Sequence, residues 1–167
     1  MGPPLTKFFA RAIAGTALVI GLCQIAHRGY AQSAPFAGMA GSWSGGGRIE
    51  LQDGTSERIR CRAAYSVGGG GSTLQQQLHC ASDSYRFEVS STVQSQGGLL
   101  SGSWSEATRN VTGQISGRAA GGRIQATIDA GAFTADLTVH TSENQQSVSI
   151  APRGTDIKVL GVTMHKG

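Results

Sequence analysis

Residues 57–82 read ERIRCRAAYSVGGGGSTLQQQLHCAS, and apolar and polar side chains alternate on both sides of four consecutive glycines. Such alternation predicts two half-buried strands, and the glycines predict the turn between them. When residues whose numbers add to 141 are paired, Cys61 faces Cys80 and the large apolar side chains share one face. A shift of one residue would move every side chain to the opposite face. The segment therefore predicts one particular antiparallel hairpin.

The two faces of this hairpin predict different features. Directly opposed residues on antiparallel strands lie at a distance that suits a disulfide, so we expect a Cys61–Cys80 bond, which is typical of an exported protein. The other face carries Arg58, Arg60 and Arg62. These arginines form a candidate anion-binding site. The favoured alternative is a solvated face that discourages aggregation between strands.

The same alternation continues through the rest of the chain, without a helical pattern. Strands are expected near residues 41–52, 57–67, 73–81, 84–94, 99–106, 110–119, 122–130, 132–141, 145–151 and 155–164. Regularly spaced strands joined by short turns predict an all-β fold. We expect a single antiparallel up-and-down β-barrel of about 8–10 strands over residues 41–167, with a β-sandwich as the alternative. Residues 32–40 are expected to be an N-terminal linker.

The inward positions of the expected strands combine aromatic and small residues. The aromatic residues are candidates for the core or for contact with a ligand: Trp43, Tyr65, Tyr85, Phe87, Trp104 and Phe133. Both tryptophans occur in the same short sequence, GSWS, and we interpret them as side chains that plug the core. Glycine and alanine at inward positions favour strand curvature, and an interior cavity for an apolar guest is the alternative.

The first residues of the chain predict a signal peptide. Two basic residues precede an apolar run over residues 12–26, and Gly29 and Ala31 supply small residues for a cleavage site after Ala31. Residues 1–31 are therefore expected to be removed, and a retained anchor is the alternative. We expect the mature protein to be periplasmic or secreted, without a transmembrane span.

Charge and motifs narrow the expected chemistry. The chain has 14 Lys and Arg against 10 Asp and Glu; three of the basic residues lie in the leader, so the mature balance is 11 − 10 = +1. Such a balance does not favour a nucleic-acid binder. No catalytic motif is present, and the spacing of His79, His140 and His165 does not suit a metal site. The expectation is a protein with no metal, no cofactor and no catalytic residue, and hence not an enzyme.

Several segments carry a resemblance to known proteins. AGSWSGGGRIEL, ERIRCRAAYSV, LQQQLHCASDSYRFEV and LSGSWSE, together with the leader, resemble a group of uncharacterised small exported β-barrel proteins of alphaproteobacteria. Gly41-Ser42-Trp43 resembles the G-x-W motif of lipocalins, within the calycin-type barrels. Bacterial inhibitors of secreted metalloproteases are similar in their early G-x-W and single disulfide. These resemblances imply a calycin-like barrel.

The expected function follows from the expected barrel and from the missing motifs. We expect a non-enzymatic exported module that binds a small apolar ligand or has a structural role. The alternative is a protein-binding module, either a protease inhibitor or a structural protein associated with the cell envelope. The expected partner is accordingly a small apolar ligand or an envelope protein.

Overall fold

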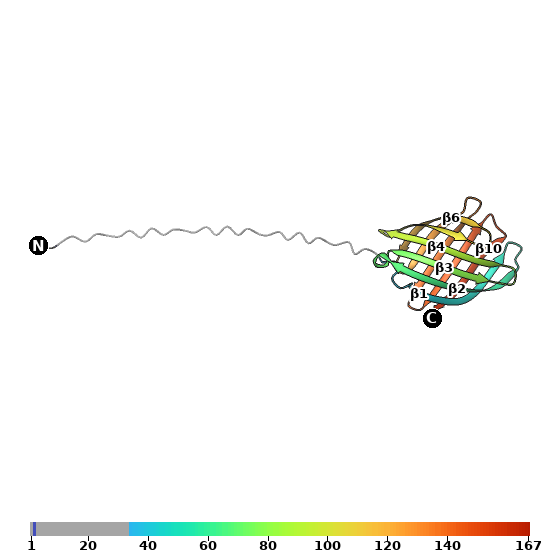
Figure 1. Ribbon diagram of the computed structural model, residues 1–167, viewed down its shortest axis with the longest axis horizontal. Helices are drawn as coiled ribbons and strands as arrows, with labels where there is room; N and C mark the ends of the chain where they lie inside the picture. The colour runs from blue at the N-terminus through green and yellow to red at the C-terminus, as the bar shows by residue number, and fades with distance from the viewer. Residues whose placement is uncertain (1, 3–33) are drawn as a thin grey trace. The chain divides into compact units, whose positions relative to one another are not determined.

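Ten antiparallel strands close into one barrel in the computed structural model, which describes residues 2 and 34–167 (Figure 1). The strands are β1 (Gly41–Leu51), β2 (Ser56–Gly68), β3 (Thr73–Ala81), β4 (Arg86–Gln96), β5 (Leu99–Glu106), β6 (Val111–Ala120), β7 (Arg123–Asp129), β8 (Thr134–Ser142), β9 (Gln145–Arg153) and β10 (Ile157–Lys166). Each strand pairs with its neighbours in sequence, and β1 pairs with β10. The predicted calycin-like up-and-down barrel is confirmed, and closure rules out the β-sandwich.

The predicted signal peptide, residues 1–31, lies outside the described residues except for Gly2. Within the described part of the chain, no helix is long and apolar enough to cross a membrane.

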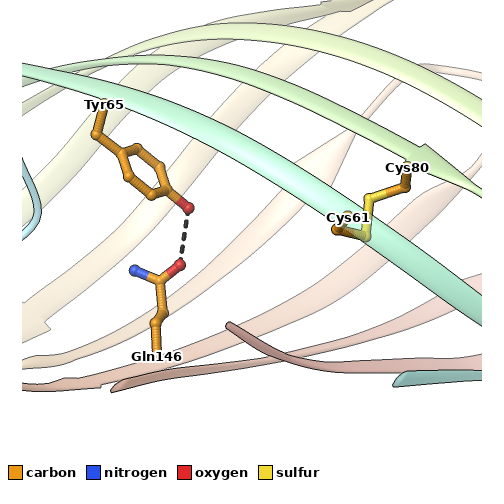
Figure 2. The surroundings of a disulfide bond; sticks show 4 residues. All are labelled: Cys61, Tyr65, Cys80 and Gln146. Carbon is orange, nitrogen blue, oxygen red and sulfur yellow. Dashed lines mark hydrogen bonds between the residues drawn. A yellow bond between two sulfur atoms is a disulfide. The ribbon is translucent and has the colours of Figure 1, made fainter. Parts of the chain in front are cut away.

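The β2–β3 hairpin has the register that its alternation predicts. Cys61 pairs with Cys80 and Val67 pairs with Leu74. The two cysteines form a disulfide between these neighbouring strands, as Figure 2 shows. The predicted pairing and the predicted disulfide are both confirmed.

The two ends of the barrel differ in the length of their connections. At one end, two-residue turns at 97–98, 121–122 and 143–144 and one four-residue connection at 69–72 join successive strands. Gly121 and Gly122 have φ angles of 55° and 75°, which suit a tight hairpin turn and which residues with side chains rarely adopt. At the other end, four-residue loops at 52–55, 82–85, 107–110 and 130–133 leave more room.

Residues before β1 close the end with the short turns. Phe36 is completely buried and Met39 is 3% exposed, although both belong to the expected linker 32–40. The backbone N–H of Phe36 donates to the carbonyl of Gly71 at 3.1 Å, and Trp43 Nε1 donates to the carbonyl of Met39 at 2.7 Å. Phe36, Met39 and Trp43 therefore plug the closed end of the barrel.

Glycines on the inner face allow neighbouring strands to approach closely. A Cβ added to Gly45 would overlap the carbonyl oxygen of Thr163 on β10. A Cβ on Gly113 would overlap the carbonyl oxygen of Asp129 on β7. These positions support the interpretation that inward glycine permits curvature. Space nevertheless remains inside the barrel.

Candidate functional site

Inward-facing hydrophobic side chains are packed unequally along the barrel. Toward the closed end they are buried, as at Leu74, Val93 and Ile115. Toward the open end, Ile49, Ile59 and Ile157 on β1, β2 and β10 are buried, but many inward-facing side chains from β3 to β9 stay partly exposed. The partly exposed residues are Leu78, Phe87, Val89, Val111, Ile128, Phe133, Leu137, Val148 and Ile150. An inward side chain of a closed barrel can reach solvent only through an internal space. The interior is therefore a cup that opens at the end with the longer loops.

The cup has a volume of about 320 Å³, and side chains from β2 to β10 form its walls. Small-molecule sites span roughly 300–1,000 Å³, so this cavity suits a compact guest. β1 contributes no side chain to the lining, consistent with its glycines and its close contact with β10. Small residues at inward positions are therefore compatible with both interpretations: they permit strand curvature, and they leave an interior cavity.

Aromatic side chains gather where the cup opens. The rings of Tyr85 and Phe87 stack with centroids 6.1 Å apart, and Trp104 lies 6.0 Å from Phe133. The Tyr85 hydroxyl donates to Asp156, a residue of the β9–β10 loop. This hydrogen bond raises the pKa of Tyr85. It also joins the start of β4 to the start of β10, two strands that do not neighbour each other in the barrel.

The structure brings five of the six candidate aromatic residues to the cavity wall: Tyr65, Tyr85, Phe87, Trp104 and Phe133. Trp43 lies below the cavity and plugs the closed end, so the two GSWS sequences place their tryptophans in different roles. Trp104 Nε1 is buried without a hydrogen-bond partner in the described part of the chain.

Tyr65 forms a polar contact near the floor of the cavity. Its hydroxyl donates to Gln146 Oε1 at 2.7 Å (Figure 2). Gln146 Nε2 in turn donates to Thr141 Oγ1 at 3.0 Å. Burial raises the pKa of Tyr65, although the hydrogen bond to Gln146 acts in the opposite direction. The tyrosine therefore stays neutral, and a buried polar pair links β2 to β9. Gln76 and Ser91, which also line the cavity, form a second polar pair beside it.

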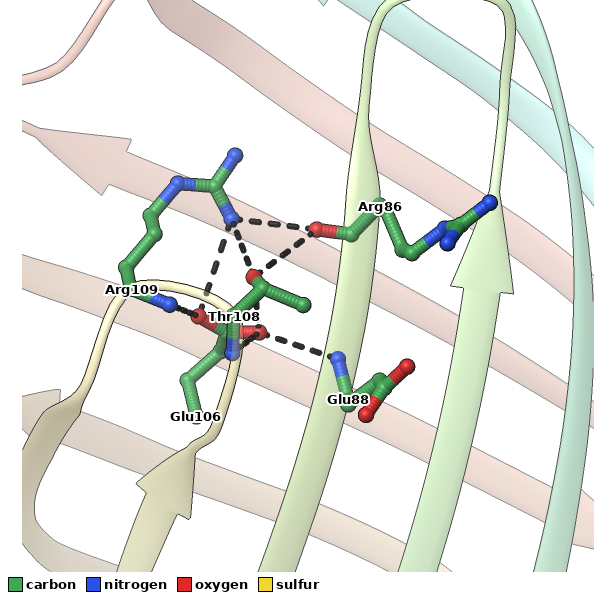
Figure 3. Close-up of polar contacts among 5 residues, drawn as sticks. All are labelled: Arg86, Glu88, Glu106, Thr108 and Arg109. Carbon is green, nitrogen blue, oxygen red and sulfur yellow. Dashed lines mark hydrogen bonds and ion pairs between the residues drawn. The ribbon is translucent and has the colours of Figure 1, made fainter.

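Glu106 organises the turn between β5 and β6 beside the cavity. Its side chain is 6% exposed, and the carboxylate accepts hydrogen bonds from the backbone N–H groups of Glu88, Thr108 and Arg109 and from the Thr108 hydroxyl (Figure 3). The Arg109 guanidinium lies 3.7 Å from Glu106 and 5.0 Å from the centre of the Phe87 ring. Sequence reasoning missed this group, although an acid two residues before a threonine in a turn is a recognisable signal.

Replacing Glu106 by glutamine tests this network. Burial raises the pKa of Glu106, but its hydrogen bonds outweigh burial and hold the pKa below the usual value. At neutral pH we expect the variant to lose about 1–3 kcal/mol of unfolding free energy, because the amide nitrogen cannot accept these N–H groups. Because the pKa of Glu106 is lower in the folded protein than in the unfolded chain, its charge stabilises the fold. This contribution is complete above the unfolded-state pKa of about 4.3, and it is lost as the pH falls through the folded-state pKa.

Urea unfolding at neutral pH and at a series of acidic pH values measures this effect. The difference between the native protein and Glu106→Gln should narrow as the pH is lowered. Glu50→Gln, the same change at an exposed position on β1, should have little effect at any pH. A Glu106→Gln deficit that stays constant down to acid pH would contradict a role for the carboxylate charge.

The three candidate arginines lie on the outer face of β2. Arg58, Arg60 and Arg62 are exposed, and none of them lines the cavity. Among the described residues, no group of three or more His, Cys, Asp or Glu side chains is arranged to hold a metal ion.

Comparison of the sequence with protein-family models and with curated proteins finds no match. Comparison of the fold finds similar solved structures. One of them is the S-type phycobiliprotein lyase CPES from Guillardia theta, with a TM-score of 0.56 and 8% sequence identity. The similarity covers 78% of this chain and 89% of that one. At this identity, the likeness shows the barrel fold alone.

The comparison contradicts the expectation that the protein is not an enzyme. That expectation came from missing catalytic motifs, and the similar barrel is named as a lyase. A barrel of this fold is therefore no argument against catalysis.

Proposed function

We propose that the barrel binds a small, mainly apolar molecule in the cup. The observation that supports this proposal is the set of inward hydrophobic side chains that stay partly exposed around a cavity of about 320 Å³. Removing apolar surface from water contributes roughly 25 cal/mol per Å², so a guest of matching shape gains affinity by covering these side chains. The plugged end and the open end together define one route of entry.

The walls and the rim contribute differently to binding. Leu137, Val148 and Ile150 form part of an apolar wall that holds the guest without fixing its orientation. At the rim, Tyr85 and Phe87 offer flat aromatic surfaces. Aromatic side chains contribute large contact areas for little conformational entropy, so the rim is where we expect selectivity for shape.

The proposal includes a bound substrate as well as a bound cargo. The similar barrel is named as a phycobiliprotein lyase, so the proposal does not restrict the cup to a passive binding role. The Cys61–Cys80 disulfide supports a location in an oxidising compartment, in agreement with the expected export.

Filling part of the cavity should weaken binding. Ala126 on β7 faces the cavity and is partly exposed, so Ala126→Leu places additional carbon atoms where the guest would lie. We expect the affinity for the uncharged apolar fluorophore N-phenylnaphthylamine to fall at least about tenfold, while unfolding free energy changes by less than about 1.5 kcal/mol. Fluorescence titration and urea unfolding measure the two quantities.

Thr127→Leu is the matched control, because residue 127 is exposed on the outer face of the same strand. It should leave fluorophore binding unchanged. The indole N–H signals in an NMR titration add a second readout: Trp104 lines the cavity and Trp43 does not, so only the Trp104 signal should move. Equal binding by both variants, or movement of Trp43 alone, would contradict binding in the cup.

A further inference from the structure

The register of four strands gathers basic side chains on the outer face of the barrel. Arg60 on β2 pairs with Ala81 on β3, and Ala81 pairs with Arg86 on β4. Two arginines therefore flank a small side chain across three neighbouring strands. In the adjacent row, Arg62 pairs directly with His79.

Small residues make this region hollow. Gly46 on β1 pairs with Arg60, so the arginine has a small residue on each side. The small residues Gly45 and Ala81 line a depression here together with Ser44, Arg60, Arg62, His79, Arg86 and Glu88. Arg58 does not line it, so the structure replaces one member of the predicted arginine cluster with Arg86 from β4.

Within residues 34–167, the arginines of the depression form no ion pair, although Glu88 on β4 is the cross-strand neighbour of His79. Among the described residues, no carboxylate lies within 4.0 Å of the guanidinium groups of Arg60, Arg62 or Arg86. The Arg86 side chain points away from Glu106, as Figure 3 shows. Three arginines and Glu88 give the depression a formal charge of 3 − 1 = +2. The whole mature chain carries 11 − 10 = +1, so positive charge is concentrated here.

Protection against aggregation does not account for these arginines. Charged residues serve that purpose on edge strands, whose backbone groups are unpaired. β2 pairs with β1 on one side and with β3 on the other, and the barrel has no edge. The arginines therefore lie in the middle of a continuous sheet. At such positions no unpaired backbone needs protection, and another reason is needed for three arginines around one depression.

We propose that this depression binds a phosphate group, carried either by a soluble phosphate ester or by a lipid headgroup. The planar guanidinium group donates two parallel hydrogen bonds to adjacent phosphate oxygens, and such bonds to a charged acceptor are stronger than neutral ones. Arg60 and Arg86 lie on opposite sides of Ala81, so one phosphate placed between them receives donors from two strands. His79 and Arg62 extend the site along the hairpin.

Titration of the mature protein with inorganic phosphate, followed by two-dimensional NMR, tests the proposal. We expect saturable shifts of the backbone signals around residues 60, 81 and 86. The double variant Arg60→Gln, Arg62→Gln should raise the Kd for inorganic phosphate at least about tenfold. The matched control is Arg118→Gln, Arg123→Gln, which removes the same charge from exposed positions on β6 and β7. It should change the Kd by less than about threefold, as expected for a screened long-range effect.

Flotation with phosphatidylcholine vesicles, with and without phosphatidic acid, distinguishes the two sources. Phosphate binding with recruitment to the phosphatidic acid vesicles identifies a lipid headgroup, and phosphate binding without recruitment identifies a soluble ester. Failure of inorganic phosphate to bind saturably, or equal losses in the two double variants, would overturn the proposal. The result does not depend on the cavity, because none of the four substituted arginines lines it.

Discussion

Replacing Cys61 and Cys80 together by serine should lower the unfolding free energy by about 3 kcal/mol, within the usual range of 2–5 kcal/mol for a native disulfide in a small secreted domain. The bond joins residues 19 apart in sequence, and it restricts the unfolded chain by closing that loop. Both side chains are also buried, at 3% and 6% exposure, so serine places two hydroxyl groups among apolar neighbours. Urea unfolding of the oxidised native protein and of the variant measures the loss.

Reduction of the native protein separates the two contributions. Breaking the bond with a reductant removes the restriction on the unfolded chain but leaves sulfur in the core. We therefore expect the reduced native protein to lie between the oxidised protein and the double serine variant. Reduced protein as stable as oxidised protein would show that the bond contributes nothing, and the whole serine effect would then come from packing.

The positions of the strands could be read from the sequence because one physical constraint acts on every strand. A closed barrel buries one face of each strand, so apolar residues recur at every second position along the chain. The expected strand ends lie within two residues of those in the structure. In the hairpin from 57 to 82 the pairing of residues across the two strands could be predicted as well. Alternation alone allows several pairings, and the requirement that Cys61 face Cys80 selects one of them.

The contents of the barrel could not be read in the same way. The alternation of apolar and polar residues is the same in a barrel with a filled interior and in a barrel with a cup. Which of the two forms depends on the summed side-chain volumes of residues from nine strands. Trp43 and Trp104 illustrate this limit. They share one sequence context, yet one plugs the closed end and the other lines the cavity.

Contacts between distant segments were also beyond sequence reasoning. Phe36 precedes the first strand and shows no alternation, so its segment was expected to be a linker. Glu106 stands among scattered acids, and its role depends on backbone N–H groups of its own turn and of Glu88. The outer depression needed the β3–β4 register to bring Arg86 beside Arg60, and alternation alone does not supply that register. The resemblance to exported alphaproteobacterial proteins stays a prediction.

Replacing Phe36 by alanine should lower the unfolding free energy by about 3–5 kcal/mol, the usual cost of removing a fully buried phenylalanine. Phe36 is completely buried at the closed end, and its backbone N–H is bonded to Gly71 in the β2–β3 turn. Shortening the side chain leaves an empty space that the barrel wall cannot fill by moving, because its strands are hydrogen-bonded to one another. Equilibrium urea unfolding of the mature chain measures the loss, and the expected cleavage after Ala31 keeps Phe36 in that chain.

Phe133→Ala provides the matched control, since it makes the same chemical change at the open end. Phe133 lines the cup and is partly exposed, so its removal enlarges a space that already exists and should cost less than half as much as Phe36→Ala. The two variants should also separate in ligand binding. Phe133→Ala should weaken N-phenylnaphthylamine more than Phe36→Ala does, because only Phe133 stands at the mouth. A loss at Phe36 as small as the loss at Phe133 would mean that residues 34–40 do not close the barrel in solution.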